Sequence, residues 1–195
     1  MNKGVCIGEV EVNSLAFVDD MMDVSRQVDD TSDAHQNAIG FSHKKKMNYS
    51  STKCNTMKVN AKKKDPTPSL EIKGEKLKNV PSVTYLGDPF NSQGDNKDLV
   101  KDRIARGTSV MISIEALMME LQLGAQTINV HLLLYEALFL SAILFNAQAW
   151  DNMSKQDTNN LITLQLKVLK KMGGSIPSNI QLLHVSGARS ATDKL

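Results

Sequence analysis

Cysteine is scarce in this 195-residue chain, and the two that occur, Cys6 and Cys54, stand far apart. Neither belongs to a CxxC pair or to a Cys/His ligand spacing, which excludes a zinc-finger type of site and a disulfide framework. The N-terminus, MNKGVCIGEV, lacks the long apolar core of a signal peptide. We therefore expect an intracellular protein.

Motifs of several common enzyme classes are also missing. The sequence contains no GxGxxG, P-loop, GxSxG or HExxH motif, so it offers no nucleotide-binding loop, nucleophile elbow or zinc-protease helix. A net charge of +2 and a pI near 8.5 are too mild to indicate a nucleic-acid partner. The distribution is more informative, because residues 9–33 carry eight acids against Arg26 and residues 44–64 carry eight lysines and no acid. An acidic centre beside a basic flank suits a metal together with phosphate.

The acidic centre is residues 15–25, LAFVDDMMDVS, in which Asp19 and Asp20 stand between two short runs of strand-forming residues. This pattern predicts a β-hairpin with two carboxylates at its tip. Two carboxylates ~4 Å apart repel by roughly 4 kcal/mol at a protein-like dielectric, so a buried pair needs a compensating cation, usually a divalent metal. The alternative is a solvated Asp-Asp turn that joins two strands.

AFVDD followed by MMDVS resembles the aromatic-x-Asp-Asp hairpin of reverse transcriptases, particularly those of non-LTR (LINE-type) retrotransposons. The resemblance implies that this stretch belongs to the palm of an RNA-directed DNA polymerase. It also implies that the protein is located in the nucleus or the cytoplasm of a eukaryotic host. It makes Asp19 a catalytic ligand of Mg²⁺ (or Mn²⁺) and Asp20 its supporting neighbour. Because successive strand residues face opposite sides, we expect the second carboxylate to turn away from the first.

The rest of residues 1–64 fits the C-terminal part of a palm. Residues 4–12 alternate weakly and predict a strand or hairpin. Residues 29–46 predict a helix, because acids stand in the first turn and cations in the last, as the helix dipole prefers. Its expected inner stripe is Ala34, Ala38 and Ile39, with Phe41 as a further candidate.

Residues 47–60, MNYSSTKCNTMKVN, return to a strand-like pattern. In the resemblance this stretch corresponds to the asparagine-x-x-lysine element that follows the palm helix. Lys53 would then lie near the incoming triphosphate and protonate the leaving pyrophosphate, a task for which a lysine ammonium is suited. The alternative is that Lys53 is one solvated lysine among eight.

Residues 65–95 are expected to form a linker and a hairpin. The run from Lys62 to Pro68 is polar and broken by proline. Residues 69–86 then predict short strands, with a turn at Gly74. Tyr85, Leu86 and Gly87 resemble the primer-grip element of these polymerases, which holds the primer terminus against the metals.

From Asn96 onward the apolar period lengthens to about 3.5 residues and predicts three amphipathic helices. The first ends near Gly124, the second covers about 126–149, and the third begins at Ser154 with Asp157 as an imperfect capping box. Residues 128–145 are almost continuously apolar. Because Glu136 stands near their centre, we interpret them as the buried central helix of a bundle and not as a membrane span.

Residues 96–175 resemble the thumb of the same polymerases through LFNAQAW and LQLKVLKKM, and residues 176–195 resemble the start of the segment beyond it. Within this resemblance a group of cations contacts template–primer phosphates; the alternative is solvated helix faces. The group is Arg103, Arg106, Lys167, Lys170 and Lys171.

The expected fold is therefore α+β: a partial palm of antiparallel hairpins plus one helix, followed by a three-helix thumb. By the resemblance the function is that of a reverse-transcriptase fragment, with an RNA template and a DNA primer as partners of the parent enzyme. We expect this chain to be inactive alone, because fingers and a further Asp strand would come from a missing segment. No membrane partner is expected. The alternatives are a non-catalytic nucleic-acid-binding module and a helical interaction module.

Overall fold

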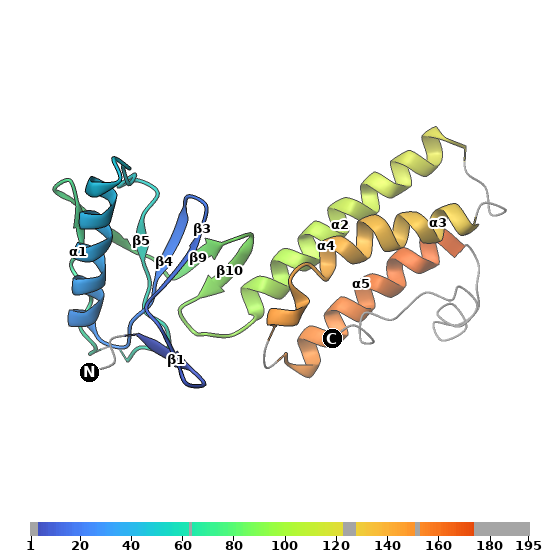
Figure 1. Cartoon of the computed structure of the whole chain (residues 1–195). Coiled ribbons are helices and arrows are strands. Elements are labelled where there is room, and N and C mark those ends of the chain that lie inside the picture. Colours follow the sequence, from blue (N-terminus) through green and yellow to red (C-terminus); the bar gives the residue numbers. More distant parts are fainter. Residues whose placement is uncertain (1–3, 63, 123–127, 151–152, 174–195) are drawn as a thin grey trace. The chain divides into compact units, whose positions relative to one another are not determined.

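The computed structural model describes residues 4–62, 64–122, 128–150 and 153–173. The chain is a mixed α+β protein with two compact units, Met1–Gly94 and Asp95–Leu195 (Figure 1). The described strands belong to the first unit, and the regular structure of the second, in its described residues, is helical. This order agrees with the α+β class predicted from the sequence.

Short two-stranded sheets and the helix α1 form the regular structure of the first unit's described residues. Among its described residues, four pairs are antiparallel hairpins and the pair β5–β8 is parallel. The strands are β1 (Val5–Ile7), β2 (Val10–Val12), β3 (Ser14–Phe17), β4 (Asp20–Asp23), β5 (Asn55–Thr56), β6 (Glu71–Ile72), β7 (Glu75–Lys76), β8 (Lys78–Asn79), β9 (Ser82–Tyr85) and β10 (Asp88–Asn91).

Two of the hairpins turn through two residues with positive φ. Lys73 (φ 54°) and Gly74 (φ 79°) join β6 to β7, and Leu86 (φ 50°) and Gly87 (φ 87°) join β9 to β10. Positive φ at both positions belongs to the type I′ turn, whose twist matches that of the flanking strands. The turn predicted at Gly74 is confirmed.

Helix α1 (Val28–Lys44) confirms the helix predicted for residues 29–46. Asp29 and Asp30 lie in its first turn, as its dipole prefers. Ala34, Ala38 and Ile39 are half-buried, but Phe41 is 49% exposed, so its candidate place on the inner stripe is wrong. The Lys45 ammonium lies 6.0 Å from the Phe41 ring centroid instead.

Two side chains tie α1 and its following loop to the strands. His35 is buried and its Nε2 lies 2.9 Å from the carbonyl oxygen of Glu71 in β6. Beyond the helix, the Tyr49 hydroxyl donates to the Met21 sulfur in β4 at 3.1 Å. Of the strand-like stretch 47–60, only β5 is a strand, and its partner β8 stands more than twenty residues later in the sequence.

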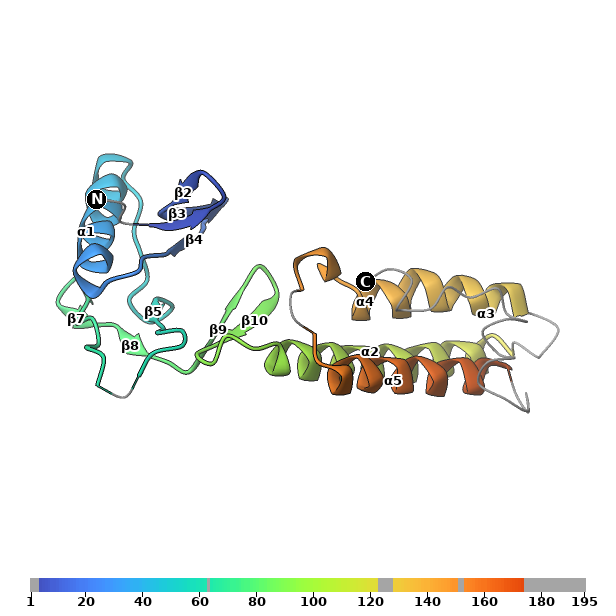
Figure 2. The ribbon, with the colours of Figure 1, turned by 90° about the horizontal axis from the view of Figure 1, so that it is seen from below.

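The second unit packs three helical segments side by side (Figure 2). Ser154 caps the last segment as the sequence predicted, because its Oγ accepts from the Asp157 N–H at 3.1 Å. The segments are α2 (Lys97–Glu120), then α3 (Ile128–Leu134) with a π-helical turn (Tyr135–Leu140) and α4 (Ser141–Ile143), and finally α5 (Lys155–Gly173). A short 3₁₀ turn, Ala147–Ala149, follows α4.

The core of the second unit lies where the three segments meet. Tyr135, Phe139 and Ile143 of the middle segment are fully buried, and Ile114 of α2 and Val168 of α5 pack in the same cluster. Gly107 allows the close approach, because a Cβ there would lie 2.6 Å from Ile143 Cγ2 and 2.9 Å from Leu164 Cδ2. Gly107 is thus the point where α2 approaches both neighbours.

The middle segment is not buried to the extent that the sequence predicted. Leu133 is 65% exposed, and Val130, Leu138 and Phe145 also reach solvent. By length and composition Asn129–Ala149 could span a membrane, with a mean hydropathy of 1.7 and 28% of its most apolar window buried. A core helix of a soluble protein passes the same test. The apolar run has a buried face, towards α2 and α5, and an exposed one.

Candidate functional site

The predicted Asp-Asp hairpin is present as β3–β4. Phe17 pairs with Asp20, so Val18 and Asp19 form a two-residue turn. The side-chain bond from Ser14 to Asp23 and the 2.9 Å bond from the Val24 N–H to the Asn13 carbonyl oxygen hold the open end. Both carboxylates at the tip, Asp19 and Asp20, are exposed to solvent.

The turn corrects one step of the sequence-based argument. Asp19 lies in the turn and only Asp20 begins a strand, so alternation along a strand does not describe how the two carboxylates are directed. Val18, directly before them, has φ 54° and is 87% exposed. A β-branched residue with positive φ costs on the order of 1–2 kcal/mol, so the tip holds backbone strain beside its two acids.

The strands that carry the tip are themselves largely exposed. All four residues of β3 are exposed, with Phe17 at 60% and Leu15 at 41%. The buried setting considered for the carboxylate pair is therefore not formed by this unit, and the tip is a solvated turn in the structure as described. Adjacent Asp carboxylates suit Mg²⁺ or Mn²⁺ chemically, but two side chains supply only part of six-fold coordination. Among the described residues, no group of three or more His, Cys, Asp or Glu side chains could hold a metal ion.

Lys53, the predicted proton donor, lies in a turn of the loop that follows α1. Its N–H donates to the Ser50 carbonyl oxygen at 3.1 Å, and its side chain is exposed. The loop is held against β4 through Tyr49. Burial, and then the nearby Asp23 carboxylate and Cys54, raise the pKa of Tyr49. The loop that carries Lys53 therefore packs against the same strand that begins with Asp20.

The predicted primer-grip residues occupy the β9–β10 turn. Tyr85 ends β9 and is half-buried, while Leu86 is 42% exposed at the tip. The second strand of this hairpin, DPFN, was not predicted from the sequence, because Asp, Pro and Asn are poor strand formers. Its ends, Asp88 and Asn91, are both 5% exposed and are polar residues that the sequence did not single out.

Arg103 was predicted to contact phosphates, with a solvated helix face as the alternative, and its burial fits neither. Its side chain is completely buried, with Nη1 3.1 Å from Asp102 Oδ2 and the guanidinium carbon 5.1 Å from the Phe145 ring centroid. Arg106 is 50% exposed, and its Nε lies 2.7 Å from the same Asp102 oxygen. Burial removes Arg103 from the surface that a phosphate could reach.

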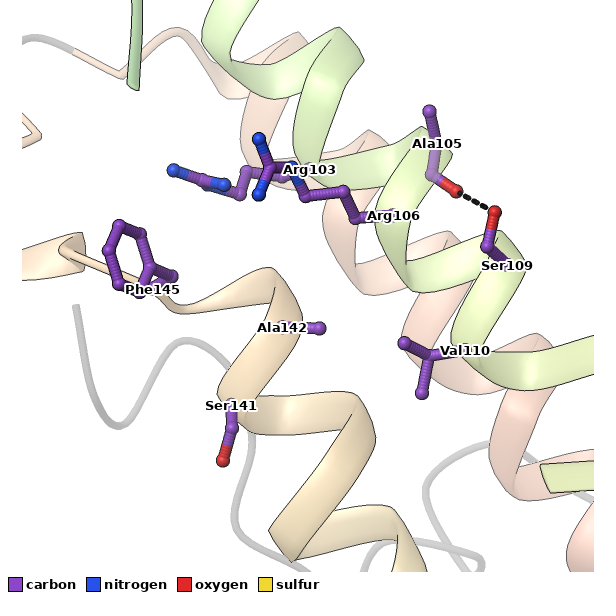
Figure 3. A pocket seen from close by; sticks show the side chains of 8 residues that line it. All are labelled: Arg103, Ala105, Arg106, Ser109, Val110, Ser141, Ala142 and Phe145. Atoms are coloured by element: carbon purple, nitrogen blue, oxygen red, sulfur yellow. Dashed lines mark hydrogen bonds between the residues drawn. The ribbon is translucent and has the colours of Figure 1, made fainter. Parts of the chain in front are cut away.

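A cleft of about 480 Å³ opens beside these arginines, between α2 and α4 (Figure 3). Val110 and Ala142 face each other across it, and the Phe145 ring lies at the end where the two guanidinium groups are found. The lining is mostly apolar apart from the arginines. Its residues are Arg103, Ala105, Arg106, Ser109, Val110, Ser141, Ala142 and Phe145.

The predicted phosphate contacts on α5 are three lysines, of which one is paired within the chain. Lys167 and Lys170 are exposed on the last turns of α5, and Lys171 forms an ion pair with Glu115 in the second half of α2. Nine residues of α2 separate Arg106 from Glu115, which is about 14 Å along the axis. Lys171 therefore lies away from the two arginines and is already paired.

No family model matches the chain, and no curated protein or solved structure matches it either.

Proposed function

We propose that the chain is the C-terminal palm and thumb part of an RNA-directed DNA polymerase of the non-LTR retrotransposon type. The observation that carries the proposal is the tip of β3–β4, where a strained Val18 directly precedes Asp19 and Asp20 in a two-residue turn. Backbone strain is enriched at functional sites. The sequence AFVDD, with its resemblance to the polymerase hairpin, supports the same assignment.

In this proposal the first unit supplies part of a palm. Asp19 and Asp20 would bind the divalent metal, which neutralises charge on the transferring phosphoryl group when bound. The loop that carries Lys53 packs on β4 through Tyr49 and would direct the ammonium towards the nucleotide phosphates. The β9–β10 turn at Leu86 and Gly87 would contact the primer.

The second unit would be the thumb. Arg106, Lys167 and Lys170 are exposed and are the cations suited to template–primer phosphates. Arg103 would act only indirectly, since its stacking on Phe145 links the first half of α2 to the residues that follow α4. Each unit carries its own part of the proposal.

Binding of Mn²⁺ to the hairpin tests the proposal. We expect paramagnetic broadening of amide NMR signals to centre on residues 17–20, with weak affinity because water must supply most of the ligands. Asp19→Asn should remove more of the effect than Asp20→Asn, since the resemblance gives the metal to the first carboxylate.

The matched control is Asp30→Asn in the first turn of α1, which changes the same charge in the same unit. It should leave the broadening of residues 17–20 unchanged. Broadening that centres on Asp29, Asp30 and Asp33 and survives Asp19→Asn would contradict the proposal. Mn²⁺ would then accumulate non-specifically near the acidic start of α1 and not at the hairpin.

A further inference from the structure

One exposed face of α2 carries no charge over about four turns. Its residues are Ala105, Ser109, Ile112, Ala116 and Met119, which follow one another at intervals of four and three residues. Ile112 is 58% exposed and Met119 is 78% exposed. A solvated helix face normally carries charged side chains, whereas this spacing is that of a seam between packed helices. We call these five residues the α2 seam.

The apolar surface continues beyond α2. Ala105 and Ser109 also line the cleft towards α4, whose other wall includes Phe145, 50% exposed. Leu138, two turns before Phe145, is 44% exposed. The α2 seam therefore adjoins the cleft that Arg106 and Phe145 also line, and is not a set of singly scattered apolar residues.

The charges of α2 run against its own dipole. Its first half carries four cations against Asp98 and Asp102, and its second half carries Glu115 and Glu120 with no cation. A helix dipole favours the reverse order. Lys171 forms an ion pair with Glu115 within the chain. The exposed Glu120 is therefore the carboxylate at the C-terminal end of α2 that a second molecule could pair with. In an antiparallel pair of α2 helices, the cations of each first half would lie beside the acids of the other helix's second half, so the unfavourable charge at both ends would be compensated.

The side-chain sizes along the α2 seam are also self-complementary. A two-fold axis at Ile112 would place Ala105 opposite Met119 of a second copy and Ser109 next to Ala116 of that copy. The small Ala105 would then face the large Met119, the two small residues Ser109 and Ala116 would allow close approach, and Ile112 would meet its own equivalent. The same axis brings the exposed Lys101 to within a turn of Glu120 of the second copy.

We propose that the α2 seam is the interface of a homodimer in which two copies of α2 pack antiparallel about Ile112. The contact is isologous, as in most two-fold dimers. Three features favour a second copy of α2 over an unrelated helix. They are the side-chain sizes along the α2 seam, the distribution of charge along α2, and the exposed face without charge. The proposal does not depend on whether the chain belongs to a polymerase.

Analytical ultracentrifugation of the whole chain over a concentration series tests the interface. We expect a monomer–dimer equilibrium, and Ile112→Glu should raise the dimer dissociation constant by ~tenfold or more, because it places two like charges at the axis. The matched control is Thr163→Glu on the exposed face of α5, which should leave the constant unchanged. A chain that stays monomeric throughout, or a dimer that Ile112→Glu leaves intact, would overturn the proposal.

Disulfide cross-linking tests the direction of the two helices, with Cys6 and Cys54 replaced by serine. Ile112→Cys should link to itself. Ala105→Cys and Met119→Cys should link to each other when the two variants are mixed, but neither should link to itself. Linkage of all three positions to themselves would mean a parallel pair and would overturn the antiparallel arrangement.

Charge reversal tests the complementarity of the ends. Lys101→Glu and Glu120→Lys should each weaken the dimer several-fold, within the range of exposed ion pairs, and the double variant should recover most of the loss. Far-UV circular dichroism shows whether each variant folds. Equal affinities for all three variants and the original chain would count against the proposed register.

Discussion

Tyr135 is the side chain whose acid–base chemistry the fold changes most. It is fully buried and its ring stacks on Phe139 with centroids 5.6 Å apart. Burial raises the pKa of its hydroxyl to about 12, although the hydrogen bond from Gln165 Nε2 to the phenolic oxygen, 2.6 Å long, opposes the rise. The folded chain therefore holds this proton more tightly than the unfolded chain does.

The free energy of unfolding should fall as the pH rises from about 10 to about 12. In that window the unfolded chain releases the Tyr135 proton, near its ordinary pKa of 10, while the folded chain retains it. Denaturation midpoints measured on both sides of pH 10 check the prediction. Tyr135→Phe should flatten the alkaline loss relative to the original chain, and an unchanged slope would show that other groups cause it.

Single residues also show where the sequence was a sufficient guide. Asp19 and Asp20 could be placed at a hairpin tip because strand-forming residues flank them on both sides, and pairing across a two-residue turn is local. Arg103 could not be placed, since the aromatic ring that its guanidinium contacts belongs to Phe145, 42 residues later. Sequence spacing contains no signal for such a contact.

Among the elements, α2 depends on Gly107 for its approach to the middle segment. Gly107→Ala adds a Cβ 2.6 Å from Ile143 Cγ2. Overpacking of this kind costs about 1–3 kcal/mol, more than the ~1 kcal/mol that alanine gains over glycine in a helix. We expect a lower thermal midpoint, measured by circular dichroism at 222 nm.

Gly40→Ala in α1 is the control for this change. It is the same substitution within a helix, but nothing lies within 4 Å of the new Cβ. Without a clash, only the helix propensity acts, so stability should rise by about 0.5–1 kcal/mol. A gain at Gly107 as large as the gain at Gly40 would mean that the three helical segments are loosely packed.

Elements were predictable where their signals are local. The acids that begin α1 and the Ser154 cap of α5 mark helix ends directly in the sequence. β5 and β8 could not be paired in advance, because a parallel pair of two-residue strands leaves no periodic pattern. The π-helical turn at Tyr135–Leu140 was hidden for a similar reason, since it lies inside an almost continuous apolar run.

For the whole molecule, the proposed function predicts that the purified 195-residue chain does not extend a primer on an RNA template with Mg²⁺ or Mn²⁺. Two-metal phosphoryl transfer needs carboxylates from more than one strand, and the β3–β4 tip supplies two adjacent, exposed ones. A gel assay for extension products checks this. Template-dependent extension that Asp19→Ala abolishes would show that the site is more complete than proposed.

The ion pair between Lys171 and Glu115 joins residues 56 positions apart, and α5 completes the core that α2 begins. During synthesis at 5–20 residues per second, roughly 3–11 s pass between the two. Over that interval the inner face of α2, including Ile114 and Gly107, lacks one of its two covering helices. We therefore expect a ribosome-bound chain of this length to present apolar helix surface for seconds, and chaperones that bind nascent chains to recognise it.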